Sequence, residues 1–225
     1  MKTSFLACLL ILVSLLARGQ TQVQANAAAA DFAQLTRYRT ANSGTSARVV
    51  FLGDSIFDYW GSRSGTWFRH FGWINRGIGG QTTSQLLLRE RNDALVIHPK
   101  ALVLEGGGND MRLGFSPEEI RDNFLTMGEL AESHGIAVFV VQMTPVCDCF
   151  KPLSGLRTVE RIHALNTLLA SMCREHHWTL IDLSAPLTGP DGHMRQELTT
   201  DGVHPNDAGY ALLAPVVERV LRRYD

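Results

Sequence analysis

Short apolar runs that alternate with longer segments of helical pattern constrain this chain more than any other feature. The main runs lie at residues 48–52, 101–104, 136–143 and 178–183. A strand that is apolar throughout has to be covered on both faces, as in a parallel sheet between layers of helices. The β-α-β-α alternation indicates the same class. The sequence therefore predicts an α/β domain, a three-layer α/β/α sandwich around a mostly parallel sheet.

The segments between these runs predict helices. Helical patterns occupy residues 83–97, 156–176 and 206–223, and another runs from Ser116 to about His134. Ser116 precedes Pro117 and two acidic residues, which together give a capping side chain, a proline at the first helical position and negative charge at the positive end of the helix dipole. We expect this helix to stop at Gly135. Residues 74–75 predict a further short strand.

The composition indicates one globular domain. The 225 residues are 45% hydrophobic and 19% charged, and the formal net charge is −1. No basic surface suggests binding to nucleic acid or anionic lipid. We see no internal repeat and no linker. The domain is expected at residues 47–225, after a lead-in at residues 26–46 with at most one helix.

The N-terminus has the layout of a secretory signal. Lys2 precedes an apolar stretch at residues 5–17, and Val23-Gln24-Ala25 predicts cleavage after Ala25 or Ala27. The stretch is shorter than the roughly 20 residues of a spanning helix, so we expect no stable membrane insertion after cleavage. Cys8 faintly matches a lipoprotein site, but the charged region before it is too short. Residues 1–25 thus predict an exported protein, periplasmic or secreted.

Three cysteines remain after such cleavage, Cys147, Cys149 and Cys173. Export permits a disulfide. Cys147 and Cys149 lie close in sequence, so a bond from Cys173 to one of them is the favoured pairing, and three free thiols are the alternative. Cys173 and His177 would share a helix face, but no second cluster of ligands accompanies them, so a metal site is not favoured.

Two of the loop motifs carry nucleophile chemistry. Gly53-Asp54-Ser55 follows an apolar run, and Asp201-Gly202-Val203-His204 places an acid and a histidine three residues apart. A hydroxyl needs a base to become a good nucleophile, and a carboxylate fixes the tautomer of that base. Taken alone, the first motif could be an ordinary helix cap. We expect Asp54 to brace its loop by hydrogen bonds rather than act as an acid.

Two glycine-rich loops complete the pattern. Residues 75–83 do not fit a dinucleotide-binding loop, because Thr82 stands where the third glycine is needed. Residues 106–110 end in Asn109-Asp110, and an asparagine amide on such a loop can donate to a developing oxyanion, although a simple turn also favours these residues. Ser55, residues 106–110 and residues 144–150 follow strands, so we expect them to meet at one sheet edge.

These four blocks in this order resemble the GDSL/SGNH hydrolase superfamily, whose serine, glycine, asparagine and histidine fall here on Ser55, Gly80, Asn109 and His204. Residues 75–83 are also similar to a block of platelet-activating-factor acetylhydrolase subunits. The resemblance runs from Arg48 to about Val220 and implies a flavodoxin-like fold. Two positions depart from the family pattern, Ile56 in place of leucine and Gln81 in place of an aspartate found in several relatives.

The resemblance implies a role for each block. Ser55 would be the nucleophile, His204 the base and then the acid, and Asp201 its orienting carboxylate. The oxyanion hole would combine the backbone N–H groups of Ser55 and Gly80 with the side chain of Asn109. Neither a metal nor an organic cofactor is implied.

The resemblance also implies the activity, a serine esterase acting on carboxylic, short-chain acyl esters. A carbohydrate O-acetylesterase, a lysophospholipase or thioesterase, and a non-catalytic carbohydrate- or lipid-binding module remain alternatives. The substrate would be a small-molecule or glycan ester, and the sequence leaves the oligomeric state open. An aromatic cluster between Trp60 and Trp73 is expected to pack in the core rather than line an acyl pocket. His193 is expected in a turn.

Overall fold

The computed structural model describes residues 30–153 and 157–224, so the predicted leader at residues 1–25 lies outside the described part. Five parallel strands form one sheet in the order β2-β1-β3-β4-β5. The strands are β1 (Val49–Gly53), β2 (Ile74–Gly77), β3 (Ala101–Leu104), β4 (Ala137–Val141) and β5 (Thr179–Ile181). This is the order of flavodoxin-like doubly wound sheets. The predicted parallel sheet is confirmed.

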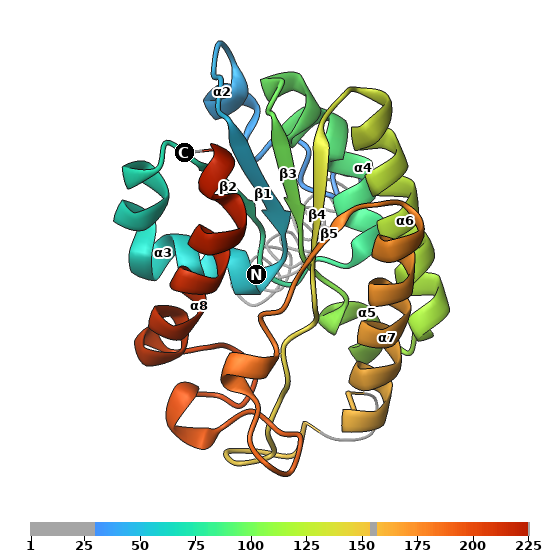
Figure 1. Cartoon of the computed structure of the whole chain (residues 1–225), viewed down its shortest axis with the longest axis vertical. Helices are drawn as coiled ribbons and strands as arrows, with labels where there is room; N and C mark the ends of the chain where they lie inside the picture. Colours follow the sequence, from blue (N-terminus) through green and yellow to red (C-terminus); the bar gives the residue numbers. More distant parts are fainter. Residues whose placement is uncertain (1–29, 154–156, 225) are drawn as a thin grey trace, which may run out of the picture.

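Helices cover both faces of the sheet (Figure 1). One face carries α3 (Ser55–His70) and α8 (Asp207–Leu221), and the other carries α4 (Thr83–Asp93), α6 (Pro117–Ser133) and α7 (Val159–Glu175). Two short helices, α2 (Arg39–Asn42) and α5 (Gly108–Arg112), precede β1 and follow β3. The three-layer prediction is therefore confirmed. Among the described residues, we find no helix with the length and apolar character needed to span a membrane.

Local signals account for the helix boundaries. At the start of α6, Ser116 Oγ accepts from the N–H of Glu119, and the Glu119 carboxylate accepts from the N–H of Ser116. This reciprocal cap satisfies two backbone donors that the first turn leaves unpaired. The segment predicted as one helix at residues 83–97 is divided, because α4 ends at Asp93 and a 3₁₀ turn, Leu95–Ile97, follows.

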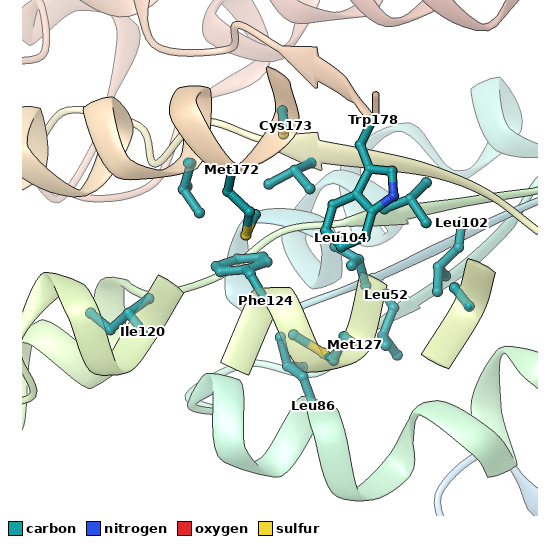
Figure 2. Close-up of a cluster of buried hydrophobic side chains, with 14 of the residues drawn as sticks. Leu52, Leu86, Leu102, Leu104, Ile120, Phe124, Met127, Met172, Cys173 and Trp178 are labelled. Atoms are coloured by element: carbon teal, nitrogen blue, oxygen red, sulfur yellow. The ribbon is translucent and has the colours of Figure 1, made fainter. Parts of the chain in front are cut away.

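The hydrophobic core has one part on each side of the sheet. Between the sheet and α4, α6 and α7, buried side chains from all three layers form a first cluster, and Figure 2 shows Leu86, Phe124 and Met172, from three different helices, within it. Alternate residues of the strands face it: Leu52 points into this cluster and Phe51 into the other. Burial on both faces explains why the sequences of the inner strands β1, β3 and β4 are apolar throughout.

The second cluster holds the predicted aromatic group under α3 and α8. The rings of Trp60 and Trp67 stack with centroids 4.8 Å apart, and Trp60 also stacks on Tyr210 of α8 at 5.2 Å. Phe71 and Trp73 form a third stacked pair at 4.4 Å. The prediction that these aromatics pack in the core is confirmed.

The predicted cysteine pairing is wrong. Cys147 and Cys149 are bonded to each other, with Cα atoms 5.3 Å apart, and Cys173 is a buried free thiol. Cys173 lies on α7 in the first cluster, whereas Cys147 packs in the second, on the other side of the sheet. The sheet thus separates the residues that the sequence analysis proposed to join, and the next cysteine along the loop is the one within reach.

Candidate functional site

Ser55 is the first residue of α3, directly after β1. Asp54 caps this helix by accepting a hydrogen bond from the N–H of Ile56 at 3.0 Å. The N–H groups of a first helical turn have no partner within the helix, and the helix dipole adds positive potential there. The backbone of Ser55 is therefore suited to stabilise negative charge in front of the sheet edge.

His204 joins Ser55 to Asp201. Its Nε2 lies 2.9 Å from Ser55 Oγ, and its Nδ1 lies 2.6 Å from Asp201 Oδ2. A carboxylate at Nδ1 favours the tautomer with the proton on that nitrogen, which leaves Nε2 to accept from the serine hydroxyl. The structure thus brings together all three residues that the sequence analysis assigned to nucleophilic chemistry.

Asp201 is held as an anion. Its other oxygen, Oδ1, accepts from the N–H groups of Val203 and His204, both at 2.9 Å. Partial burial opposes ionisation, but the hydrogen bonds from His204 and Val203 outweigh it and lower the Asp201 pKa to about 2. Asp201 therefore stays charged at any ordinary working pH.

Neighbouring backbone fixes the loop that carries His204. The N–H of Cys147 donates to the carbonyl of Gly202 at 2.8 Å, and Thr199 Oγ1 accepts from the N–H of Gly202 at 3.0 Å. Gly202 has a φ of +86°, and a Cβ there would overlap the carbonyl of Cys147. The disulfide-containing loop after β4 therefore abuts the histidine loop.

The glycine-rich loop at residues 75–83, the second of the four blocks, lies against the start of α3. The N–H of Gly79 donates to Asp58 Oδ2 at 2.8 Å, and a Cβ at Gly79 would be 3.7 Å from that of Ser55. Gly80 has a φ of +83°, in the left-handed region that favours glycine. The predicted loop thus lies beside Ser55, and Gly80 adopts a left-handed backbone conformation that other residues rarely adopt.

Asn109 connects its own loop, residues 106–110, to the Ser55 turn and to the glycine-rich loop at residues 75–83. Its Nδ2 donates to the carbonyl of Gln81 at 2.9 Å and to Asp54 Oδ2 at 3.2 Å. The next residue, Asp110, accepts from the N–H and hydroxyl of Thr83 at the start of α4. The amide of Asn109 consequently lies between the Ser55 turn and the glycine loop, where the sequence analysis expected it.

Gln81, noted as a departure from the family pattern, has a structural role. It is buried, donates from Nε2 to the carbonyl of Ala33 at 2.8 Å and accepts at Oε1 from Arg89 Nε at 2.5 Å. Gln81 therefore ties the glycine loop to the lead-in segment and to α4.

Two residues near Ser55 were missed by the sequence analysis. Glu105, at the end of β3, is 5% exposed, and its Oε2 accepts from the N–H of Asp54 at 3.0 Å. Arg157 donates from Nε to the carbonyl of Gly108 at 2.6 Å. The signal that could have found Glu105 is an acidic residue directly after an apolar strand, but the arginine had no comparable sequence signal.

A small cavity adjoins the serine, and we call it the Ser55 cavity. Its volume is about 20 Å³, and its lining includes Asp54, Ser55, Glu105, Asn109, Met143, Thr144, Val146, Arg157 and Val203. The exposed ring of Tyr59 lies beside the histidine, with its ring centroid 4.5 Å from that of His204. The site therefore combines a narrow cavity, lined by both polar and apolar side chains, with an aromatic residue at its rim.

Other residues singled out from the sequence lie apart from this cavity. His193 sits in a turn closed by a 2.7 Å hydrogen bond from the N–H of Gly189 to its carbonyl, as predicted. Within residues 30–153 and 157–224, no three histidine, cysteine or acidic side chains are grouped as metal ligands would be.

The chain is similar to known proteins in sequence and in overall fold. A model of the GDSL-like lipase/acylhydrolase family matches residues 51–212. The chain is similar to an acylhydrolase candidate from Bacteroides fragilis, at 27% identity with a TM-score of 0.80, covering 86% of this chain and 98% of the other. A GDSL-like lipase from Bacteroides thetaiotaomicron matches at 26% identity with a TM-score of 0.79, covering 85% and 98%.

A shorter match links the chain to YqeF, an uncharacterised lipoprotein of Bacillus subtilis. The two are 32% identical over 81 residues, so the match spans only 33% of either chain. The family model, in contrast, covers most of this chain and includes the blocks around Ser55, Gly80, Asn109 and His204. The chain belongs to the GDSL-like lipase/acylhydrolase family.

Proposed function

We propose that the chain is an exported serine esterase that hydrolyses short-chain carboxylic esters through an acyl-enzyme intermediate. The observation that carries this proposal is the pair of contacts at His204, 2.9 Å to Ser55 Oγ and 2.6 Å to Asp201 Oδ2. A nucleophile within hydrogen-bond reach of a base, which is in turn oriented by a carboxylate, is the arrangement that covalent acyl transfer requires.

In the first half of the reaction, Ser55 Oγ attacks the ester carbonyl while its proton passes to Nε2 of His204. The imidazolium that forms is stabilised by Asp201, whose low pKa of about 2 keeps it anionic. His204 then gives the proton to the leaving alcohol. In the second half, water attacks the acyl-enzyme with the same histidine as base, and the acid is released.

The tetrahedral intermediates place negative charge on the former carbonyl oxygen. Donors for this oxygen are the N–H of Ser55 at the start of α3, the N–H of Gly80 and the side-chain amide of Asn109. Asn109 Nδ2 donates to the oxyanion by giving up its longer hydrogen bond, 3.2 Å to Asp54, while it keeps the 2.9 Å hydrogen bond to the carbonyl of Gln81. Loss of one such donor typically costs about 3–4 kcal/mol of transition-state stabilisation.

The size of the Ser55 cavity supports a short acyl group. About 20 Å³ holds little more than one water molecule, and Met143, Val146 and Val203 limit its extension. Turnover of p-nitrophenyl esters from acetate to palmitate would test this: we expect the highest kcat/KM for the shortest chains, and an optimum at palmitate would contradict it.

Export is supported by Lys2, the apolar stretch at residues 5–17 and the small residues after it. The partial match to a lipoprotein is in keeping with an exported chain. The mass of the protein recovered after expression in a bacterial host tests export with cleavage. Removal of residues 1–25 or 1–27 would lower the mass by a defined amount, and a full-length mass would contradict the proposal.

A fluorophosphonate probe tests whether the site is catalytic or only binds ligands. The probe phosphonylates a serine only if that serine is activated as a nucleophile. We expect one adduct on Ser55, none in Ser55→Ala, and an unchanged adduct in Ser62→Ala, which alters an exposed serine of the same helix. An unlabelled wild-type protein would favour a binding module.

A further inference from the structure

Two buried carboxyl groups lie next to each other behind Ser55. Glu105 directly follows β3, Asp54 lies between β1 and α3, and both residues line the Ser55 cavity. Glu105 Oε2 accepts from the N–H of Asp54 at 3.0 Å. Gly53 makes room for this contact, since a Cβ there would lie 2.5 Å from Glu105 Oε2. The close fit indicates that this contact is a built feature of the site.

The pair has room for one negative charge. Two carboxylates in contact and away from water cannot both ionise, so one of them holds a proton. Burial raises the pKa of Asp54, but its carboxylate accepts hydrogen bonds from the N–H of Ile56 and from Asn109, and the positive charge of Arg157 favours its ionised form. The anion therefore belongs on Asp54 and the proton on Glu105.

The groups around Glu105 support this placement. Burial, followed by the charge of Asp54, raises the pKa of Glu105 well above its usual range, and Asp110 on α5 adds to the effect. From α8, the uncharged hydroxyl of Tyr210 faces the region and donates to the carbonyl of Ile56 at 2.8 Å.

We propose that Glu105 is a positioning residue that, as a neutral acid, donates a hydrogen bond to the Asp54 carboxylate and thereby sets the Asn109 amide for the oxyanion. This inference rests on the proposed function. In the resting site, Asp54 competes with the oxyanion for one hydrogen of Asn109 Nδ2. The hydrogen bond from Glu105 offsets part of the Asp54 charge, so Asn109 is released more easily when the oxyanion forms.

Two substitutions separate this role from simple packing. Glu105→Gln keeps an acceptor for the N–H of Asp54 and a neutral donor for its carboxylate, and we expect kcat within about threefold of wild type. Glu105→Met keeps the length but removes the donor, so Asp54 holds Asn109 more strongly. We expect kcat to fall by about tenfold or more with KM little changed.

Glu90→Gln is the matched control. Glu90 is also a fully buried carboxyl, but it lies on α4 and is not among the residues that line the Ser55 cavity. We expect its substitution to leave kcat unchanged. A Glu105→Met variant with native circular dichroism and wild-type kcat would overturn the proposal, as would a folded Glu105→Gln variant as impaired as Glu105→Met.

Infrared spectroscopy reads the proton without any substrate. At pH 7 the difference spectrum between wild type and Glu105→Gln should contain the C=O stretch of a protonated carboxylic acid, and its absence would overturn the proposal. The infrared test does not depend on whether Glu105→Met folds. Failure of the proposed function would look different: wild type and Ser55→Ala would hydrolyse ester equally slowly, and the infrared result would be unaffected.

Discussion

Ser55 Oγ and His204 Nε2 lie 2.9 Å apart although 149 residues separate them in the sequence. The parallel sheet produces this proximity. Ser55 follows β1, an inner strand of the sheet, and the histidine loop is tied to the loop after β4 through the hydrogen bond from the N–H of Cys147 to the carbonyl of Gly202. Because the carboxyl ends of parallel strands share one edge, loops from distant parts of the chain converge there.

The Asn109 amide is expected to act in the transition state. In Asn109→Ala, we predict a fall in kcat of about 10²–10³-fold with little change in KM, because the lost bond strengthens only as the oxyanion forms. Steady-state kinetics on a p-nitrophenyl ester measure both parameters. Asn92→Ala, at an exposed position on α4, serves as the control. A change confined to KM would speak against an oxyanion role.

Asp201 is expected to matter less than the residues it supports. Asp201→Asn keeps the shape but loses the charge that stabilises the imidazolium, and we predict a fall in kcat of roughly 10²–10⁴-fold, smaller than for Ser55→Ala. Asp207→Asn, whose side chain is 82% exposed, should leave kcat unchanged. Full activity in Asp201→Asn would show that backbone contacts alone orient His204.

Glu90 is expected to make the free energy of unfolding depend on pH. Burial raises its pKa to about 8, and its carboxyl oxygens have no hydrogen-bond partner among the described residues. An acid with a raised pKa in the folded state favours folding fully only below its unfolded pKa, 4.5 here, and that contribution is lost as pH rises through about 8.

Glu90→Gln removes this titration. We therefore predict that the difference in Tm between Glu90→Gln and wild type grows in favour of the variant from pH 5 to about pH 9. Thermal unfolding across that range, with Glu118→Gln as an exposed control, measures it. A difference that does not change with pH would mean that Glu90 is not buried as a neutral acid.

The cysteine arrangement predicts a thiol count. For a chain that begins at residue 26, peptide mapping without reduction should show Cys147 linked to Cys149. Cys173 should react with iodoacetamide only after unfolding, since burial raises its pKa to about 12 and hides it in the core. A peptide that links Cys173 to either partner would contradict the structure.

Much of the fold could be predicted because the inner strands are apolar on both faces, as Val49–Gly53 and Ala101–Leu104 are. The helix α3 was not predicted. Its Ser55–His70 segment contains two glycines and a break in helical geometry at Ser64, so its pattern is weak. Its stability comes from packing of Trp60 and Phe68 under α8, which no local signal reveals.

The candidate site was predictable where short motifs carry the chemistry. Ser55, Gly80, Asn109 and the Asp201–His204 pair each lie in a recognisable block. Glu105 and Arg157 were missed because their importance depends on which strand ends are neighbours. The predicted cysteine pairing was wrong for the same reason, because sequence spacing does not tell on which side of the sheet Cys173 lies.

Hydrolysis of p-nitrophenyl acetate by wild type and Ser55→Ala tests the central claim most directly, with Ser62→Ala as the matched control. Wild type and Ser62→Ala are predicted to turn over at the same rate, and Ser55→Ala to lose at least about 10³-fold in kcat while its circular dichroism stays native. Equal turnover by folded Ser55→Ala and wild type would contradict the account.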